Sequence, residues 1–212
     1  MKIAEPDVTL SDFGLSVESA ILGLLIAIQP AAQPPVQALF VAFFLAITIA
    51  SVCGGLVHGF LIIPHSRSQD SVWRIALVAL GAAAVSSWAI TAWVALHGPW
   101  SAVLVIVAVI LYLVYVFVVV FVHYDYRIAI VHYVPALLAL AFTFFRSWML
   151  HGTPMLLVGV AGIVLALVAG VIQQNRIGIH PVYFSYNALY HLNQGVALFA
   201  IFLGARALIR GS

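Results

Sequence analysis

Histidine and carboxylate side chains are the residues of this chain whose types could do chemistry. The 212 residues include 8 histidines and 6 acidic residues but a single cysteine, Cys53. Imidazole and carboxylate groups bind divalent metals and transfer protons, whereas one cysteine excludes a disulfide framework, a CxxC redox pair and a Cys-based zinc or iron–sulfur site. The chemistry to look for is therefore metal binding or proton transfer by histidine and carboxylate.

Two of the histidines lie on polar helical faces within apolar sequence. His58 shares a face with Ser51, because residues seven apart are two helical turns apart. His191 lies between Asn187 and Gln194 at spacings of four and three, which places all three on one face. Polar faces inside a membrane either hold helices together or line a site. The sequence therefore permits His58 and His191 to meet in one polar cavity.

Three further candidates have competing explanations. Glu18 lies about two turns inside an apolar run. A charge there costs at least a few kcal/mol unless it is paired or hydrated, so we expect Arg74 or a histidine as its partner. Asp70 could pair with Arg74, four residues on, or belong to a site. His132 could be a ligand, or it could satisfy the backbone carbonyl that Pro135 leaves free.

These residues must be positioned by membrane-spanning helices. Hydrophobic residues make up 65% of the chain and charged residues 7%, against roughly 25% charged in soluble domains, which excludes a soluble enzyme, a disordered chain and a nucleic-acid-binding module. Apolar runs that span a bilayer must be helical, because each segment has to satisfy its own backbone polar groups. We predict seven such helices, at about residues 12–29, 36–63, 72–96, 101–122, 128–145, 155–172 and 185–209. The fold class is all-α, a polytopic membrane bundle of seven transmembrane helices in a single domain over residues 1–212.

Segment order places most ionisable groups on one side of the membrane. All six acidic residues and six of the eight histidines, His180 among them, fall on or near the side that holds the N-terminus. Arginine and lysine are too evenly divided to decide the orientation. We expect an integral multi-pass protein of the cell (inner) membrane. Its first helix is predicted to open at a capping box over Thr9 to Asp12.

One combination of positions stands out against this seven-helix background. A histidine late in the second helix, His58, is followed by Asp70 a dozen residues on and by His191 early in the seventh helix. This arrangement resembles the CREST superfamily, which includes alkaline ceramidases, progestin/adiponectin-type receptors and related membrane hydrolases. The resemblance implies a zinc ion held by three histidines, with a serine and an aspartate assisting the bound water.

The chain departs from the CREST pattern at two positions. Gly54 stands where the family has a serine, and Asn187 stands where it has the first histidine of the seventh helix. His58 and His191 would therefore need a third ligand, because catalytic zinc takes three protein ligands. The residues that could complete the set are His132, His180 and Glu18.

The first functional hypothesis is an intramembrane metal-dependent hydrolase of a lipid-like amide or ester. Zinc would activate water and polarise the carbonyl, Asp70 would serve as general base and then proton donor, and Asn187 would orient water or the carbonyl oxygen. Ser51 shares the face of His58 but lies about 10 Å along the helix axis from it. A membrane lipid is the expected partner, because the site lies within the bilayer.

The alternative is a non-catalytic lipid-binding or accessory subunit of a larger membrane complex that has lost the metal site. Gly54 and Asn187 motivate this hypothesis, because they replace residues of the metal motif. Haem ligation by two transmembrane histidines ranks third. Retinal is excluded because Lys2 is the only lysine, and a net charge of +2 indicates no nucleic-acid partner.

Overall fold

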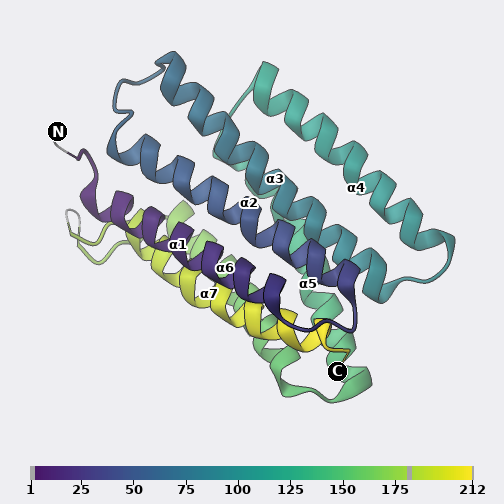
Figure 1. Cartoon of the computed structure of the whole chain (residues 1–212). Helices are drawn as coiled ribbons and strands as arrows, with labels where there is room; N and C mark the ends of the chain where they lie inside the picture. Colours follow the sequence, from purple (N-terminus) through teal and green to yellow (C-terminus); the bar gives the residue numbers. More distant parts are fainter. Residues whose placement is uncertain (1–2, 181–182, 212) are drawn as a thin grey trace.

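The computed structural model describes residues 3–180 and 183–211, and this part of the chain forms a bundle of seven long helices (Figure 1). Each helix is long and apolar enough to cross a membrane, so the chain is an integral multi-pass membrane protein. The predicted all-α fold is confirmed. The helices are α1 (Pro6–Ile28), α2 (Pro34–Gly59), α3 (Arg67–Ala95), α4 (Pro99–Phe117, extended by a π-helical turn, η1, Val118–Val122), α5 (Tyr126–His151), α6 (Pro154–Gln174) and α7 (Tyr186–Ile209).

The start of α1 differs from the prediction. The helix begins at Pro6, and proline favours the first helical position because its fixed φ suits a helix and its missing N–H needs no partner there. Thr9 therefore lies inside the helix, where its hydroxyl donates to the Glu5 carbonyl at 2.7 Å. The predicted capping box over Thr9 to Asp12 is wrong. Asp12 instead becomes a buried residue in the second turn.

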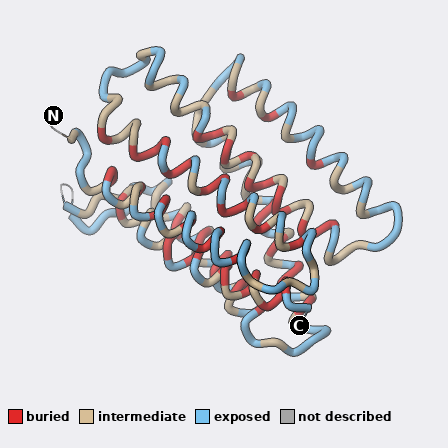
Figure 2. The backbone as a smooth tube through the Cα atoms, in the orientation of Figure 1, coloured by how far each residue is buried: buried red, intermediate tan, exposed pale blue. Residues whose placement is uncertain are grey.

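Six of the helices form a ring, in the order α1, α2, α3, α5, α6 and α7, with α7 returning to α1. The remaining helix, α4, packs on the outside of α3 (Figure 1). Most of its length is exposed in Figure 2. Tyr112 and Tyr115 attach it to α3 by donating hydrogen bonds to the backbone carbonyls of Val78 and Leu77. The interior of the ring is thus enclosed by helices far apart in sequence.

The end of the ring that holds the C-terminus is solidly packed, and we call it the packed half. Phe40 and Phe144 are fully buried there and stack with ring centroids 6.1 Å apart. Gly159 of α6 and Gly204 of α7 touch through their backbones, so that a Cβ added at Gly204 would lie 2.8 Å from the Gly159 Cα. Such close backbone approach is how small residues hold membrane helices together.

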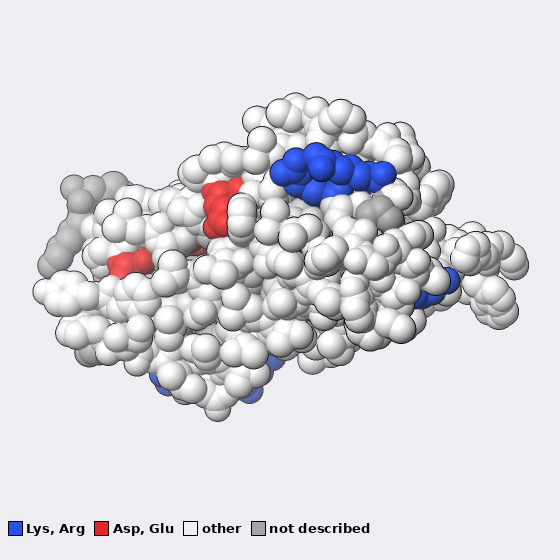
Figure 3. Space-filling view, turned by 90° about the horizontal axis from the view of Figure 1, so that it is seen from below, with Lys and Arg blue, Asp and Glu red and all other residues white. Residues whose placement is uncertain are grey.

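The opposite end carries the N-terminus and the loops after α2, α4 and α6 (Figure 1). Most of the face in Figure 3 carries no charged side chain, and the acidic residues visible on it lie toward this end. At this end α3, α5 and α7 begin with side-chain caps, from Ser66, Asp125 and Ser185 respectively. We call this end the hollow half, because it encloses a cavity.

Candidate functional site

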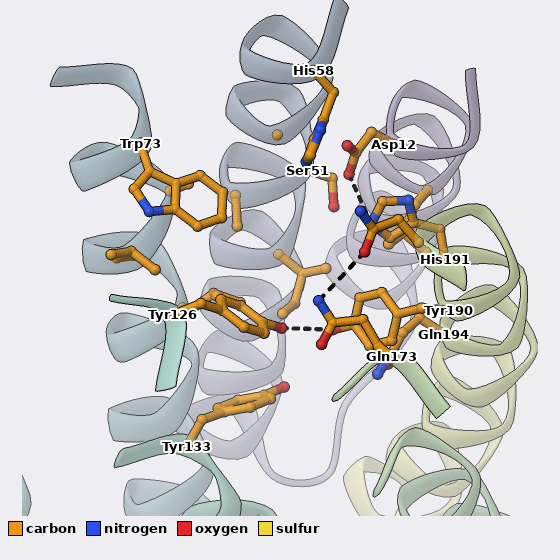
Figure 4. A pocket seen from close by; sticks show the side chains of 18 of the residues that line it. Asp12, Ser51, His58, Trp73, Tyr126, Tyr133, Gln173, Tyr190, His191 and Gln194 are labelled. Carbon is orange, nitrogen blue, oxygen red and sulfur yellow. Dashed lines mark hydrogen bonds and ion pairs between the residues drawn. The ribbon is translucent and has the colours of Figure 1, made fainter. Parts of the chain in front are cut away.

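A cavity of about 270 Å³ occupies the centre of the hollow half (Figure 4). All six helices of the ring contribute to its wall. Four of the candidate site residues predicted from the sequence line it, namely His58 and Ser51 from α2 and His191 and Asn187 from α7. His58 and His191, which the sequence permits to meet in one cavity, do share one.

His191 is held between two neighbouring residues of α1. Its Nε2 lies 3.3 Å from Asp12 Oδ1, and its Nδ1 lies 2.9 Å from Ser11 Oγ. The side chains of His191 and Asp12 are only 11% and 6% exposed, so the pair is almost completely removed from water. The interaction of a carboxylate with an imidazole is strong in such a setting, because no solvent screens it.

The glycine of α2 that departs from the CREST pattern makes room for this pair. A Cβ at Gly54 would lie 2.9 Å from both carboxylate oxygens of Asp12, closer than a carbon atom normally approaches. The absence of a side chain therefore lets the carboxylate of α1 rest directly against α2. Its second oxygen, Oδ2, is buried without a hydrogen-bond partner.

His58 occupies a more open position than His191. Its Nδ1 lies 3.1 Å from Glu5 Oε2, and the two side chains are 24% and 53% exposed. An ion pair that exposed contributes little to stability, typically about 0–1 kcal/mol. In Figure 4, His58 lies above Asp12 at the end of the cavity nearest the α2–α3 loop.

A layer of hydroxyl and amide groups forms the deeper wall. The Tyr126 and Tyr190 hydroxyls lie 3.0 Å apart and hydrogen-bond across the ring. Gln173 donates to the Asn187 side-chain oxygen at 3.4 Å, and Gln194 donates to the Ala166 carbonyl at 3.1 Å. These groups largely satisfy one another, as polar groups in a membrane interior must.

An apolar groove between α5 and α6 adjoins the cavity. It encloses about 420 Å³, and lipid-facing side chains such as Leu138 and Val171, 53% and 59% exposed, form its outer edge. The groove and the cavity have five wall residues in common, Leu80, Tyr126, Tyr133, Tyr190 and Gln194. Polar interior and lipid-facing surface are therefore separated by a single layer of side chains.

The other residues predicted from the sequence lie elsewhere. Asp70 accepts a hydrogen bond from the Tyr124 hydroxyl at 3.2 Å, outside the cavity wall. The His132 ring stacks on Tyr115, with centroids 4.4 Å apart, where α5 faces α4. His180 lies in the segment before α7, where its Nδ1 accepts the Tyr183 N–H.

Glu18 faces the outer surface of the bundle rather than the cavity. It lines a groove of about 650 Å³ between α1 and α7, with its carboxylate against Gly195. The expected partner for Glu18 is not found, because within the described residues neither Arg74 nor any histidine forms an ion pair with it. Arg74 instead packs over the Tyr124 ring at 4.6 Å.

The described residues do not fit a zinc site. Within residues 3–180 and 183–211, no group of three or more His, Cys, Asp or Glu side chains is placed to hold a metal ion. His58 and His191 share the cavity, but His132 faces α4 and Glu18 faces the outer groove.

The residue that sequence reasoning missed is Asp12. With α1 starting at Pro6, four buried polar residues of this helix recur at spacings of three, four and three, and they are Thr9, Asp12, Ser16 and Ser19. Asp12 and Ser19 are thus seven residues apart, as are Ser51 and His58 on the polar face of α2. A helix start at Pro6 instead of Thr9 predicts this polar face of α1 and places Asp12 in the interior of the bundle.

The whole helical bundle corresponds to one protein family. The profile of a family of unknown function, DUF6962, matches residues 8–210. The chain belongs to this family. No curated protein and no solved structure matches the chain. The DUF6962 match covers all the residues of the cavity wall, so the site is part of the family's domain.

Proposed function

We propose that this DUF6962 protein binds a single-chain amphiphile taken from the bilayer, with the polar end in the cavity and the apolar chain in the α5/α6 groove. One observation carries the proposal, namely that the cavity and the groove have Tyr126, Tyr190 and three other wall residues in common. A ligand that enters from the lipid meets the groove first and the polar cavity behind it.

The two compartments would contribute differently to binding. An acyl chain gains little by leaving lipid for the groove, because lipid tails are as apolar as the groove wall. The polar end gains more, since hydrogen bonds are strong where water is excluded. The Asp12 and Asn187 side chains of the cavity wall offer such bonds. Affinity would therefore come mainly from the head group, and the groove would set the length and number of chains.

Filling the groove tests this proposal. Gly170 lines the groove and a Cβ there has no atom within 4 Å, so we expect a Gly170→Leu side chain to extend into the groove. Dodecanol added to the protein in nanodiscs should raise the midpoint of thermal unfolding by about 2–4 °C, and Gly170→Leu should abolish that rise. Gly14→Leu is the matched control, because Gly14 is equally open but lines the outer α1/α7 groove. Equal shifts in all three proteins, or none in the wild type, would refute amphiphile binding at this groove.

A second candidate function is hydrolysis of a lipid-like ester or amide, the reaction expected from the resemblance to CREST hydrolases, but with a serine nucleophile in place of zinc-activated water. The contact of Ser11 with His191, which also contacts Asp12, favours it. Ser11 also lines the outer α1/α7 groove, from which a lipid could approach. Ser11 Oγ would attack the carbonyl carbon as its hydroxyl turns from the Val8 carbonyl and passes its proton to His191 Nδ1. That proton would then go to the leaving alcohol or amine, and water would release the acyl group from Ser11. The proposed roles of Asp70 and Asn187 as general base and orienting group stay predictions.

The hydrolytic candidate is tested by labelling with a long-chain alkyl fluorophosphonate, which forms a covalent bond with an activated serine. Labelling should be lost in Ser11→Ala and retained in Ser16→Ala. Both serines donate to the carbonyl three residues back, at 2.9 and 2.8 Å, but Ser11 also contacts the imidazole. No labelling of the wild type, or equal labelling of both variants, would exclude Ser11 as a nucleophile.

A further inference from the structure

The unpartnered oxygen of Asp12 indicates which head group the cavity accepts, an inference that rests on the proposed amphiphile binding. Asp12 is 4% exposed, its Oδ1 faces His191, and its Oδ2 has no hydrogen-bond partner. In Figure 4 the carboxylate points into the cavity. A buried carboxylate oxygen without a donor is costly, because burial removes the water that would otherwise bind it. A ligand that brings an N–H or O–H group would remove that cost.

The rest of the cavity wall provides no positive charge to balance an anionic ligand. Neither lysine nor arginine is among the wall residues. The nearby arginine of α3, Arg74, packs over Tyr124 instead. At the end of the cavity near the α2–α3 loop, Glu5 adds a second carboxylate beside His58. The fixed charges around the cavity are therefore acidic.

The charge state of His191 does not change which head group the cavity favours. If His191 is neutral, Asp12 leaves the cavity with a net negative charge. If His191 is protonated, the two charges cancel, and an anionic head group still meets the unpaired Oδ2 of Asp12. With Asp12 ionised, a cationic donor is favoured over a carboxylate or phosphate in both states of His191.

We propose that the cavity selects amphiphiles with a primary ammonium head group and rejects those with an anionic one. One ammonium N–H donates to the Asp12 carboxylate, which rotates to bring its buried Oδ2 to the ligand, and the chain passes between Tyr126 and Tyr133 into the α5/α6 groove. A hydroxyl head group is accepted less well, because its hydrogen bond to the carboxylate involves one charged partner instead of two.

Three probes with the same chain test the selection, namely dodecylamine, dodecanol and dodecanoate. Their affinities are measured from the rise in thermal unfolding midpoint in nanodiscs of uncharged lipid. We expect dodecylamine to bind about tenfold more tightly than dodecanol, and dodecanoate to bind more weakly than both. If dodecanol binds and dodecanoate binds as well as dodecylamine, the head-group selection is wrong while amphiphile binding stands. If none of the three binds, amphiphile binding itself is wrong.

Neutralising the carboxylate assigns the selection to Asp12. In Asp12→Asn the advantage of dodecylamine over dodecanol should fall to less than about twofold, while the dodecanol shift shows that the variant is folded. Asp7→Asn is the matched control on the same helix, because Asp7 accepts the Ser185 N–H outside the cavity and asparagine can accept it too. Dodecylamine should keep its advantage in Asp7→Asn. Retention of the full advantage in Asp12→Asn would overturn the proposal.

Discussion

The packed half and the hollow half of the ring use the same residue types for opposite purposes, and α6 passes through both. In the packed half, a Cβ at Gly162 would lie 2.7 Å from the Ala197 carbonyl oxygen of α7. In the hollow half, a Cβ at Gly170 would have no atom within 4 Å. Glycine brings two helices together at one end and leaves a groove open at the other. Glycine thus has opposite effects at the two ends of α6, which indicates that the hollow is a specific feature of the fold and not a packing defect.

The largest expected effect is the difference in stability between leucine substitutions at Gly162 and at Gly170. Gly162→Leu should prevent folding, because its side chain meets the backbone of α7, which cannot move aside without opening the packed half. Gly170→Leu should leave the free energy of unfolding within about 1 kcal/mol of the wild type. Yield of monodisperse protein and thermal unfolding in detergent measure both. Equal tolerance of the two variants would show that the two halves do not differ in packing.

A smaller effect is expected from the aromatic residues of the two halves. Phe144 is fully buried and packs on Phe40 and Gly159, so Phe144→Ala should lower the free energy of unfolding by about 3–5 kcal/mol. Tyr133→Phe, which removes one hydroxyl from the cavity wall, should lower it by less than about 1 kcal/mol. Denaturant titration followed by tryptophan fluorescence compares them. Similar losses of unfolding free energy in the two variants would contradict the difference in packing between the two halves.

The smallest effect concerns the contact between Gly54 and Asp12. Gly54→Ala should cost about 1–2 kcal/mol, because its methyl group displaces the Asp12 carboxylate, which belongs to a short side chain on the facing helix. In an Asp12→Ala background the same change should cost close to nothing. This double-mutant cycle measures the interaction between positions 54 and 12, because both substitutions change the same contact. An equal cost in the two backgrounds would mean that Asp12 does not rest against Gly54.

Sequence patterns predicted the depth of side chains better than their direction. The lengths of the apolar runs gave seven helices, and the order of the segments put His58 and His191 near the same end of the bundle, where they line one cavity. Depth along a helix follows from local hydropathy. Direction around the helix depends on which neighbours pack against it, and that information is not local. Asp70 and His132 therefore have suitable depths but face Tyr124 and the outer helix α4.

The cavity depends on Asp12, whose buried environment was not predicted from the sequence. Thr9 and Asp12 have the spacing of a capping box, which is a local signal, and that signal competed with Pro6 for the helix start. The three-residue contact of Ser11, Asp12 and His191 joins residues about 180 positions apart in sequence. Only the closure of the ring by α7 against α1 brings them together.

The most direct test of the central claim, that an amphiphile held in the cavity extends its chain into the α5/α6 groove, is photo-cross-linking with a dodecylamine that carries a diazirine in mid-chain. Labelled residues are located by peptide mass spectrometry of protein irradiated in nanodiscs. The account predicts adducts concentrated on groove residues such as Val134, Leu138 and Leu167, and their loss in Gly170→Leu. Adducts spread over the lipid-facing surface of α4, with no excess in the α5/α6 groove, would contradict it.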